Sequence, residues 1–285
     1  MNSAKEIAEK IVNHEFDVSK EEIDVLTKEV MDINDGKPNI IKVPRDKFIF
    51  VGDLHGDLDS LLKVQTMLKK YRNYSFIFLG DYADRGPRQV ETINLVMSLH
   101  ILNPERVVIL RGNHESEEIA ARYGFELAVR RNFDRSTFNY YLRVFKSIPM
   151  GAMTASNIFA VHGGIPEGVT SLQDMQEPDR HHYNFPNDIL FQMVWNDPQE
   201  ADFDFRPNMR SARARTYGQR AFEEFLQNIG ADLIIRAHEV YPEGFQEYFS
   251  GGLLSLFSAS YQGQSSPKVL RIEKDRKIEV IALDA

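Results

Sequence analysis

The feature that most constrains the fold of this chain is an apolar run that recurs along it and stops each time at Asp, Asn or His, usually beside Gly. Runs of β-favouring residues with such ends predict buried strands. Five of them follow one another, FIFVGD, SFIFLGD, RVVILRGNH, NIFAVHGG and ADLIIRAHE. Ligands gather at strand ends in α/β proteins, because loops converge there while the strands fix their position. The pattern therefore predicts a ligand site built on a sheet.

Helical patterns separate the first three runs. Residues 59–71 and 90–102 carry apolar side chains at helical spacing. A sixth run, GGLLSLFSAS, comes late, and the chain closes with a predicted hairpin that turns near Asp275 and Arg276. Strands and helices that alternate early, followed mainly by strands, predict an α/β fold with a large, two-layered sheet. Residues 172–210 are the least regular, and we expect surface helices and loops there.

The N-terminal part predicts a pair of helices within residues 4–34. Ser19 followed by Glu22 has the spacing of a capping box, which marks the start of the second helix. We therefore expect residues 1–38 to form a helical segment packed on the body, and residues 39–285 to form the catalytic part of a single domain. A helix that docks a partner is the alternative interpretation.

Composition excludes several classes of function. The 285 residues carry a net charge of -8, which argues against general attraction to nucleic acid or to an anionic membrane. The chain has no cysteine, so any metal must be held by oxygen and imidazole ligands, which suit Mn, Fe, Zn or Mg. The N-terminal stretch lacks the apolar core of a secretory signal, and no run approaches the roughly 18 apolar residues of a membrane span. We expect a soluble, cytoplasmic protein.

The polar strand ends supply six candidate metal ligands. Carboxylates, imidazoles and an amide oxygen together suit two divalent cations, and one carboxylate, Asp81, could bridge them. A water shared by two metals supplies hydroxide near neutral pH. A single His or Asp of this kind is commonly a core or surface residue, but six at successive strand ends favour a metal site. The six are Asp53, His55, Asp81, Asn113, His162 and His238.

Residues beside these ligands predict a phosphate ester as the substrate. The planar donor forks of Arg85 and Arg111 match phosphate oxygens. His114 adjoins a candidate ligand and could give a proton to a leaving alkoxide, with Asp84 to orient it. Separately, these residues could form salt bridges or turns. Together they predict metal-assisted hydrolysis of a phosphate ester.

Three motifs make the chain resemble a known family. In the motifs GDLHGD, GDYADRG and RGNHE, Asp81 follows Asp53 by 28 positions and Asn113 follows Asp81 by 32. In this order and spacing they resemble the signature of the phosphoprotein phosphatases, the metal-dependent serine/threonine phosphatases of the calcineurin-like metallophosphoesterase superfamily. The similarity continues through VHGGI, VWNDP, RAHEV and LFSASYQG, so it covers roughly residues 40–280.

The resemblance implies a β-sandwich flanked by helices, with a dinuclear metal site at a sheet edge. It assigns Asp53, His55 and Asp81 to one metal, and Asp81, Asn113, His162 and His238 to the other. It also implies a general acid, its carboxylate partner, two phosphate-binding arginines and a tyrosine near the centre, which match His114, Asp84, Arg85, Arg210 and Tyr261. Arg213 competes with Arg210 for the second arginine.

The same resemblance implies the reaction and its partners. The expected reaction is hydrolysis of phosphoserine and phosphothreonine in proteins, in one step, by direct attack of a metal-bridging hydroxide. The expected cofactors are two divalent ions, Mn²⁺ in vitro, with an Fe/Zn pair as the alternative in vivo. Phosphoprotein substrates and regulatory subunits are the expected partners, and nucleic acid and membrane are not.

The chain departs from the family pattern in one loop and one motif. Gln262 stands where the family often has cysteine, SASY is shorter by about one residue, and Asp57 replaces a commoner glutamine. These departures leave every metal position intact but put sensitivity to natural toxins in question. The rival interpretations are a dinucleoside polyphosphate hydrolase, a phosphoprotein-binding scaffold without activity, and a metal-dependent nuclease.

Overall fold

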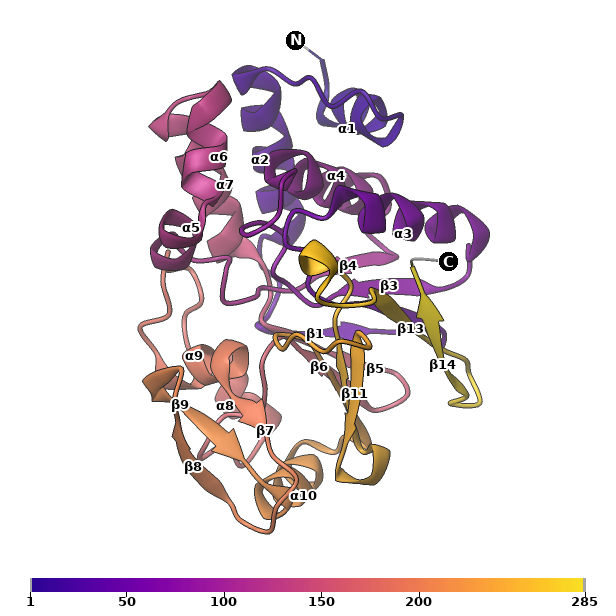
Figure 1. Cartoon of the computed structure of the whole chain (residues 1–285), viewed down its shortest axis with the longest axis vertical. Helices are drawn as coiled ribbons and strands as arrows, with labels where there is room; N and C mark the ends of the chain where they lie inside the picture. Colours follow the sequence, from indigo (N-terminus) through magenta and orange to yellow (C-terminus); the bar gives the residue numbers. More distant parts are fainter. Residues whose placement is uncertain (1, 284–285) are drawn as a thin grey trace.

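Two β-sheets pack face to face in the computed structural model, which describes residues 2–283 (Figure 1). The first sheet has the strand order β1 (Ile40–Val43), β5 (Gly151–Thr154), β6 (Ile158–Val161), β10 (Leu233–Arg236), β12 (Leu253–Leu256) and β11 (Phe245–Tyr248). The second has the order β14 (Ile278–Ala282), β13 (Lys268–Ile272), β2 (Phe48–Val51), β3 (Ser75–Phe78) and β4 (Val107–Ile109). The two-layered α/β architecture expected from the sequence is confirmed.

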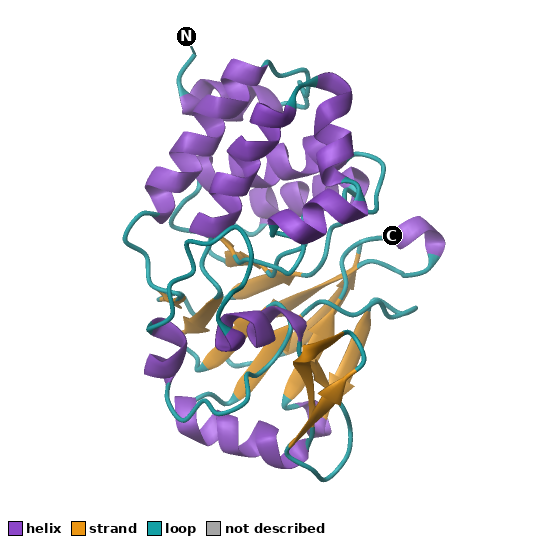
Figure 2. Ribbon diagram, turned by 90° about the vertical axis from the view of Figure 1, so that its left-hand side faces the viewer, coloured by secondary structure: helices purple, strands orange, loops and turns teal. Residues whose placement is uncertain are grey.

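Helices cover the outer faces of both sheets, as Figure 2 shows. On the second sheet lie α1 (Ala4–Val12), α2 (Lys20–Asn34), α3 (Leu58–Lys70), α4 (Gln89–Leu102), α5 (Glu117–Tyr123), α6 (Phe125–Asn132) and α7 (Arg135–Ser147). The first sheet packs against α8 (Leu172–Gln176), α9 (Asp188–Trp195) and α10 (Gln219–Ile229). Short 3-10 turns occupy Phe249–Gly251 and Tyr261–Gly263.

Continuous apolar runs are explained by this layering, because neighbouring side chains of a strand point to opposite faces. In β2, Phe48 and Phe50 point into the space between the sheets, where they meet residues such as Ile235 of β10. Ile49 and Val51 point to the other side, into the core beneath the helices. Both faces of β2 are thus buried, and an alternating polar pattern is absent from it.

The parallel pairing brings the polar strand ends together. Strand β2 pairs parallel with β3, and β3 pairs parallel with β4, while β10 pairs parallel with β6 and β12. Their carboxyl ends therefore lie at one edge of the sandwich. At that edge a parallel bridge between Asp53 and Phe257 joins the two sheets.

The predicted helices at the N-terminus and the predicted C-terminal hairpin both occur. Ser3 and Ser19 cap α1 and α2 through capping boxes, and β13 pairs antiparallel with β14 around Arg276, whose φ is 63°. The helices of residues 2–283 are all too short or too polar to cross a bilayer.

Residues 172–210 are more ordered and more buried than expected. Leu190, Met193 and Val194 of α9 belong to the core beneath the first sheet. The sequence analysis also missed a small sheet, β7 (Asp197–Pro198), β9 (Ser211–Tyr217) and β8 (Phe205–Asn208). Its strands carry Arg and Pro residues, and most positions of β8 and β9 are exposed or half-buried, so no apolar pattern indicates them.

Candidate metal centre and active site

All six predicted metal ligands meet at the sandwich edge where the two sheets are joined. Each is at most 8% exposed, although each is polar. They come from the loops that follow five strands: Asp53 and His55 after β2, Asp81 after β3, Asn113 after β4, His162 after β6 and His238 after β10. The site therefore draws on both sheets.

Asp81 lies between two groups of these side chains. Its Oδ2 is 3.6 Å from His55 Nε2, and its Oδ1 is 3.4 Å from His162 Nε2. Asp53 Oδ2 is also 3.6 Å from His55 Nε2. Ligand atoms of Asp81, His162 and His238 all lie within 4.8 Å of one another. One oxygen of Asp81 thus faces each group of side chains.

The unpaired atoms of the cluster fit divalent cations. Asp53 Oδ2 and His238 Nε2 are buried without a hydrogen-bond partner among residues 2–283, which is costly unless something positive binds them. The Asn113 side-chain amide lies 2.9 Å from His162 Nε2, so the two groups face the same point. Burial raises the pKa of Asp53 to about 7 and that of Asp81 well above its usual value, as expected for carboxyls that lack a positive partner.

The imidazoles are oriented by the backbone. His55 Nδ1 donates to the Ala83 carbonyl at 2.9 Å, and His162 Nδ1 donates to the Leu79 carbonyl at 2.9 Å. Burial lowers the pKa of both rings well below the usual value, which favours neutral imidazole. The Nε2 lone pairs are therefore free for a metal, the arrangement that metal-binding histidines commonly have.

The ligand loops hold a strained backbone. His55, Asp81, Asp84, Arg85 and His238 all have positive φ, between 43° and 75°, which is uncommon for residues with a side chain. Strain of this kind persists only where surrounding contacts enforce it, and it clusters at functional sites.

Glu115 enforces the conformation of two ligand loops, and sequence analysis gave it no role. Its buried carboxylate accepts the N–H groups of Asp81 at 2.8 Å, Tyr82 at 3.0 Å and Gly112 at 2.9 Å. A Cβ on Gly112 would lie 2.2 Å from Asp81 Oδ1, so only glycine fits there. The sequence signal that could have indicated this role is the position of Glu115 in RGNHE, directly after Asn113 and His114.

His114 forms a buried pair with Asp84. Its Nδ1 is 2.6 Å from Asp84 Oδ2, while Asp84 Oδ1 accepts the N–H of Phe125 at 2.8 Å. Burial raises the pKa of Asp84 to about 8 and lowers that of His114 to about 3, so burial favours the neutral forms of both. In a neutral pair, the Asp84 carboxyl carries the proton of the 2.6 Å bond to His114 Nδ1. The His114 ring then carries its own proton on Nε2, which faces the cleft.

A cleft of about 330 Å³ opens above the ligands. Arg85 and Arg210 both line it, together with His114 and Tyr261. The Arg85 guanidinium stacks 4.0 Å from the centre of the Tyr123 ring. The cleft thus combines five of the six predicted metal ligands with two cationic side chains and His114.

The structure separates Arg210 from its competitor. Arg210 Nε donates to Asp197 Oδ2 at 2.7 Å, and Asp197 Oδ1 accepts from the buried Arg236 at 3.0 Å, so Asp197 holds Arg210 at the rim of the cleft. Arg213 instead pairs with Asp188 at 2.6 Å and lies outside the residues that line the cleft.

The prediction that Arg111 binds phosphate is wrong. Its side chain is completely buried, and its donors go to the backbone carbonyls of Glu115, Arg180 and His182, each at 2.9 Å. Arg111 therefore fastens the segment around residue 181 to the loop after β4. Asn113, two residues on, lies against His162 and His238, whereas the Arg111 side chain points away from them.

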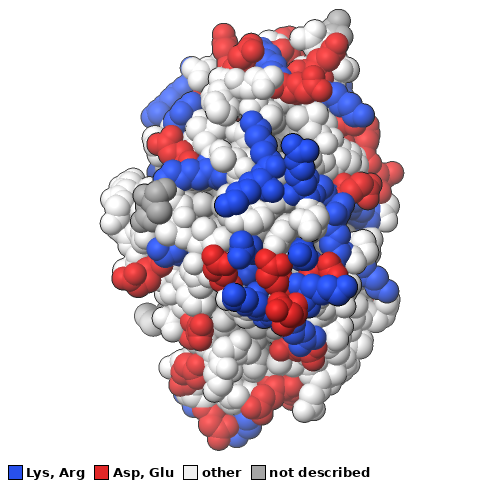
Figure 3. All heavy atoms as spheres, turned by 90° about the vertical axis from the view of Figure 1, so that its right-hand side faces the viewer, with Lys and Arg blue, Asp and Glu red and all other residues white. Residues whose placement is uncertain are grey.

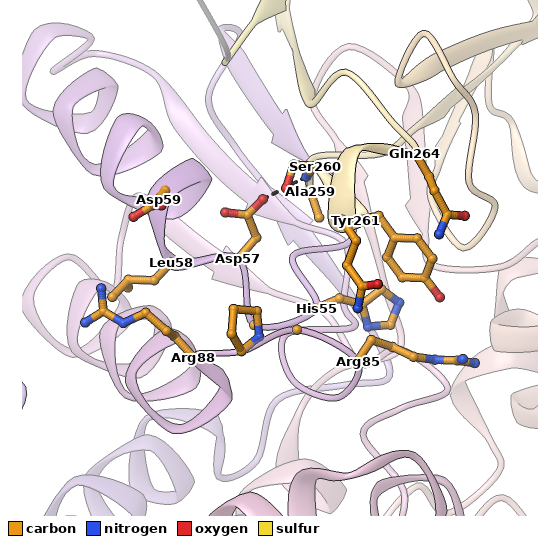
Figure 4. Close-up of a pocket in the computed structure, with 14 residues that line it drawn as sticks. His55, Asp57, Leu58, Asp59, Arg85, Arg88, Ala259, Ser260, Tyr261 and Gln264 are labelled. Atoms are coloured by element: carbon orange, nitrogen blue, oxygen red, sulfur yellow. Dashed lines mark hydrogen bonds between the residues drawn. The ribbon is translucent and has the colours of Figure 1, made fainter.

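A second cavity, of about 370 Å³, adjoins the cleft and is called the side cavity here. His55, Arg85 and Tyr261 line both spaces. Figure 4 shows residues that line the side cavity, with Asp57 bonded to Ser260 and with Tyr261 near His55.

Known proteins share this chain's sequence and fold. The family model described as Calcineurin-like phosphoesterase matches residues 46–242. The serine/threonine-protein phosphatase 4 catalytic subunit of Kluyveromyces lactis is 33% identical over 79% of this chain and 73% of its own length. That of Saccharomyces cerevisiae is 30% identical over 89% of this chain and 82% of its own length.

Solved structures show the same fold. A serine/threonine phosphatase from Saccharomyces cerevisiae, described as similar to human phosphatase PP5, superposes with a TM-score of 0.84 at 24% identity, over 93% of this chain and 90% of that one. A putative diadenosine tetraphosphatase superposes with a TM-score of 0.50 at 15% identity, over 86% of this chain and 98% of that one.

Proposed function

Since the chain belongs to the calcineurin-like phosphoesterase family, we propose that the cleft described above is its active site and that its substrates are phosphoserine and phosphothreonine in proteins. It is a metal-dependent serine/threonine protein phosphatase, like the relatives that match most of its length. The observation that carries the assignment of the site is the cluster around Asp81, which lies in one cleft with Arg85, Arg210 and His114.

Two divalent ions fit the ligand cluster. Asp53, His55 and Asp81 would hold one ion, and Asp81, Asn113, His162 and His238 the other. When bound, such ions stabilise negative charge on a phosphate and lower the pKa of water, which supplies the hydroxide needed for direct attack on phosphorus. We propose Mn²⁺ as the activating ion in vitro and an Fe/Zn pair as the alternative in the cell.

Arg85 and Arg210 would bind the phosphate. Their guanidinium groups are fixed by the Tyr123 ring and by Asp197, respectively, so they are in place before the substrate arrives. Donors that are held in position stabilise the charge that develops on phosphate oxygens without reorganising first. Tyr261 completes the rim between the cleft and the side cavity.

His114 would act as the general acid. Its Nε2 faces the cleft side of the pair while Asp84 holds Nδ1, so the imidazole can give a proton to the departing seryl or threonyl oxygen. Asp84 is fixed in turn by the Phe125 N–H. This proton is what an alkoxide leaving group requires at neutral pH.

The charge pattern supports protein substrates over nucleic acid. Lys and Arg side chains gather across the middle of the face in Figure 3, but Asp and Glu side chains lie directly below and among them. With a net charge of -8, the surface does not favour a polyanionic chain. Regulatory subunits and a cytoplasmic location are proposed with the phosphoprotein substrates, since the relatives are named catalytic subunits.

Phosphate release by chelator-treated protein, with and without added Mn²⁺, tests the proposal. The two substrates are a phosphoserine protein and diadenosine tetraphosphate. We expect Mn²⁺-dependent release that favours the phosphoprotein. A preference for the dinucleotide would leave the assignment of the active site intact but change the substrate class. If phosphate were released from neither substrate, the protein would be better explained as a phosphoprotein-binding protein without activity.

A further inference from the structure

The loop that carries Tyr261 is firmly attached at its two ends. At its start, Ser258 Oγ accepts the Gly52 N–H at 2.8 Å and donates to the Lys268 carbonyl at 2.5 Å. At its end, Ser265 Oγ donates to the Tyr241 carbonyl at 2.7 Å. The ends therefore leave a six-residue segment, 259–264, whose position must be set by other contacts.

Apart from the Ser265 N–H, which donates to the Ser260 carbonyl at 3.2 Å within the same loop, that middle segment forms a hydrogen bond with the described part of the protein at one point. Its backbone forms internal bonds, such as the Gly263 N–H to the Ser260 carbonyl at 2.9 Å. Within residues 2–283, its one hydrogen bond to another segment runs from the Ser260 N–H to Asp57 Oδ2, at 2.7 Å (Figure 4). Positive φ at Tyr261 (47°) and Gln262 (60°) adds local strain that this tether must offset.

Asp57 has two separate tasks, one for each carboxylate oxygen. Oδ1 accepts the Ser60 N–H at 3.0 Å and so caps the start of α3. Oδ2 accepts the Ser260 N–H and also the Ser60 hydroxyl, at 3.0 Å. A helix cap needs only the first oxygen. The second oxygen joins the loop after β2, which supplies metal ligands, to the loop after β12.

The tether determines where Tyr261 stands. The Tyr261 ring packs against His55, 5.7 Å between ring centres, and against Phe257, at 5.6 Å. It lines both the cleft and the side cavity, so it forms the wall between the phosphate position and the neighbouring space. The proposed phosphoprotein substrate extends beyond its phosphate, so residues beside the phosphoserine can contact this rim, whereas a small aryl phosphate fills only the cleft.

We propose that Asp57 is a positioning residue for phosphoprotein binding: its Oδ2 holds Ser260, and through it the Tyr261 wall, against the metal-ligand loop. This inference rests on the proposed phosphoprotein substrate. It assigns a task to the aspartate that replaces the commoner glutamine of the motif. It also separates binding of the polypeptide around the phosphate from the chemistry at phosphorus.

Asp57→Asn tests the tether while sparing the helix cap. Asn caps helices as well as Asp does, so α3 keeps its start, but the amide offers one acceptor oxygen in place of two. Ser60→Ala is the matched control, because it removes the hydroxyl bond to the same Oδ2 and leaves the Ser260 tether intact. Thermal unfolding should show both variants folded.

Two readouts follow. In metal-free protein, hydrogen exchange of the segment 259–264 should accelerate about tenfold in Asp57→Asn, the scale of one lost hydrogen bond, and stay at the wild-type rate in Ser60→Ala. With Mn²⁺, the KM for a phosphopeptide should rise by about the same factor, with a much smaller change in kcat/KM for an aryl phosphate. Equal losses on both substrates, or unchanged exchange, would overturn the proposal.

Ser260→Pro provides a double-mutant test. The φ of Ser260 is -68°, close to the value that proline fixes, and proline removes the N–H donor. In this background, Asp57→Asn should no longer raise the phosphopeptide KM, because the bond is already gone. An undiminished effect would show that Asp57 acts by another route.

The tests distinguish the tether from the function on which it rests. A wild-type protein that does not act on phosphopeptides would overturn the proposed substrate, while the exchange measurement would still decide whether Asp57 holds the loop. An active wild type with indistinguishable variants would overturn the tether alone.

Discussion

The loops that carry the metal ligands and the loop that carries Tyr261 lie side by side, yet they are held very differently. Glu115 alone takes three backbone N–H groups from the loops after β3 and β4. Among residues 2–283, the segment 259–264 has one hydrogen bond outside its own loop, to Asp57. The ligand loops are buried, whereas residues 262–264 are exposed. The difference indicates a preorganised chemical centre beside an adjustable rim.

Removing the metals should have the largest effect, because it abolishes the chemistry for every substrate. Chelator treatment should eliminate turnover of both a phosphopeptide and an aryl phosphate, and Mn²⁺ should restore both in parallel. Circular dichroism controls for unfolding. If Mn²⁺ restored activity on one substrate but not on the other, the two substrates would not share one metal centre, and the contrast between centre and rim would be wrong.

His114→Asn should lower kcat for a phosphopeptide by roughly 10²- to 10⁴-fold, the usual scale of general acid catalysis. The loss should be much smaller for an aryl phosphate, because its leaving group needs little protonation. KM should change little, in contrast to the Asp57 variant. Steady-state kinetics on both substrates would check this, and equal losses would remove His114 from the role of general acid.

Glu115→Gln should weaken metal binding about 10- to 100-fold, as other changes behind metal ligands do. Both carboxylate oxygens of Glu115 accept backbone N–H groups, from Asp81, Tyr82 and Gly112. The glutamine side chain would replace one of these acceptors with an NH₂ donor. Titration of Mn²⁺ against activity and by calorimetry measures the change. At saturating Mn²⁺ most of the activity should return; wild-type metal affinity would show that the centre does not depend on this support.

Arg210→Gln should lower kcat/KM about 10- to 100-fold, the scale of one or two hydrogen bonds to a charged group. Arg213→Gln is the matched control from the same hairpin, and it should stay within about twofold because its partner Asp188 is a surface residue. Comparable losses in the two variants would contradict the placement of Arg210 at the phosphate.

His100 should affect stability in acid without affecting turnover at neutral pH. Burial lowers its pKa from 6.5 to about 4, with Nδ1 donating to the Val107 carbonyl at 2.6 Å. The unfolded chain therefore binds the proton first, so stability falls as the pH drops from 6.5 to 4, by about 3 kcal/mol.

His100→Asn keeps a donor for the carbonyl of Val107 but cannot titrate. Urea unfolding of the two metal-free proteins between pH 8 and pH 4 should therefore show a flatter profile for the variant. Parallel profiles would show that the acid sensitivity has its source elsewhere, for example in the carboxylates of the cleft.

The sequence predicted the two-layered sheet and the strand ends at which the six candidate ligands meet, because these depend on short-range patterns. An apolar strand that stops at Asp53 or His162 indicates both the strand and what its end carries. Arg111 shows the limit of such reasoning, since its proximity to Asn113 in sequence does not reveal that its side chain points toward the carbonyls of Arg180 and His182.

Contacts between distant segments explain the remaining differences. Asp57 and Ser260 are 203 residues apart, and no local pattern connects them. The choice between Arg210 and Arg213 depended on Asp197, which belongs to a small sheet that lacks an apolar signature. Glu115 stood in a recognised motif, but only the folded backbone shows which N–H groups it accepts.

The joining of the two sheets at Asp53 and Phe257 has a consequence for the life of the protein. One ion would take Asp81 and Asn113 from one sheet and His162 and His238 from the other, so it would act as a clasp across the sandwich. The free energy of binding such an ion to the folded protein adds to the free energy of unfolding. We therefore expect metal scarcity to shorten the lifetime of the folded protein as well as to abolish its activity. The amount of protein in the cell should then depend on the supply of ions.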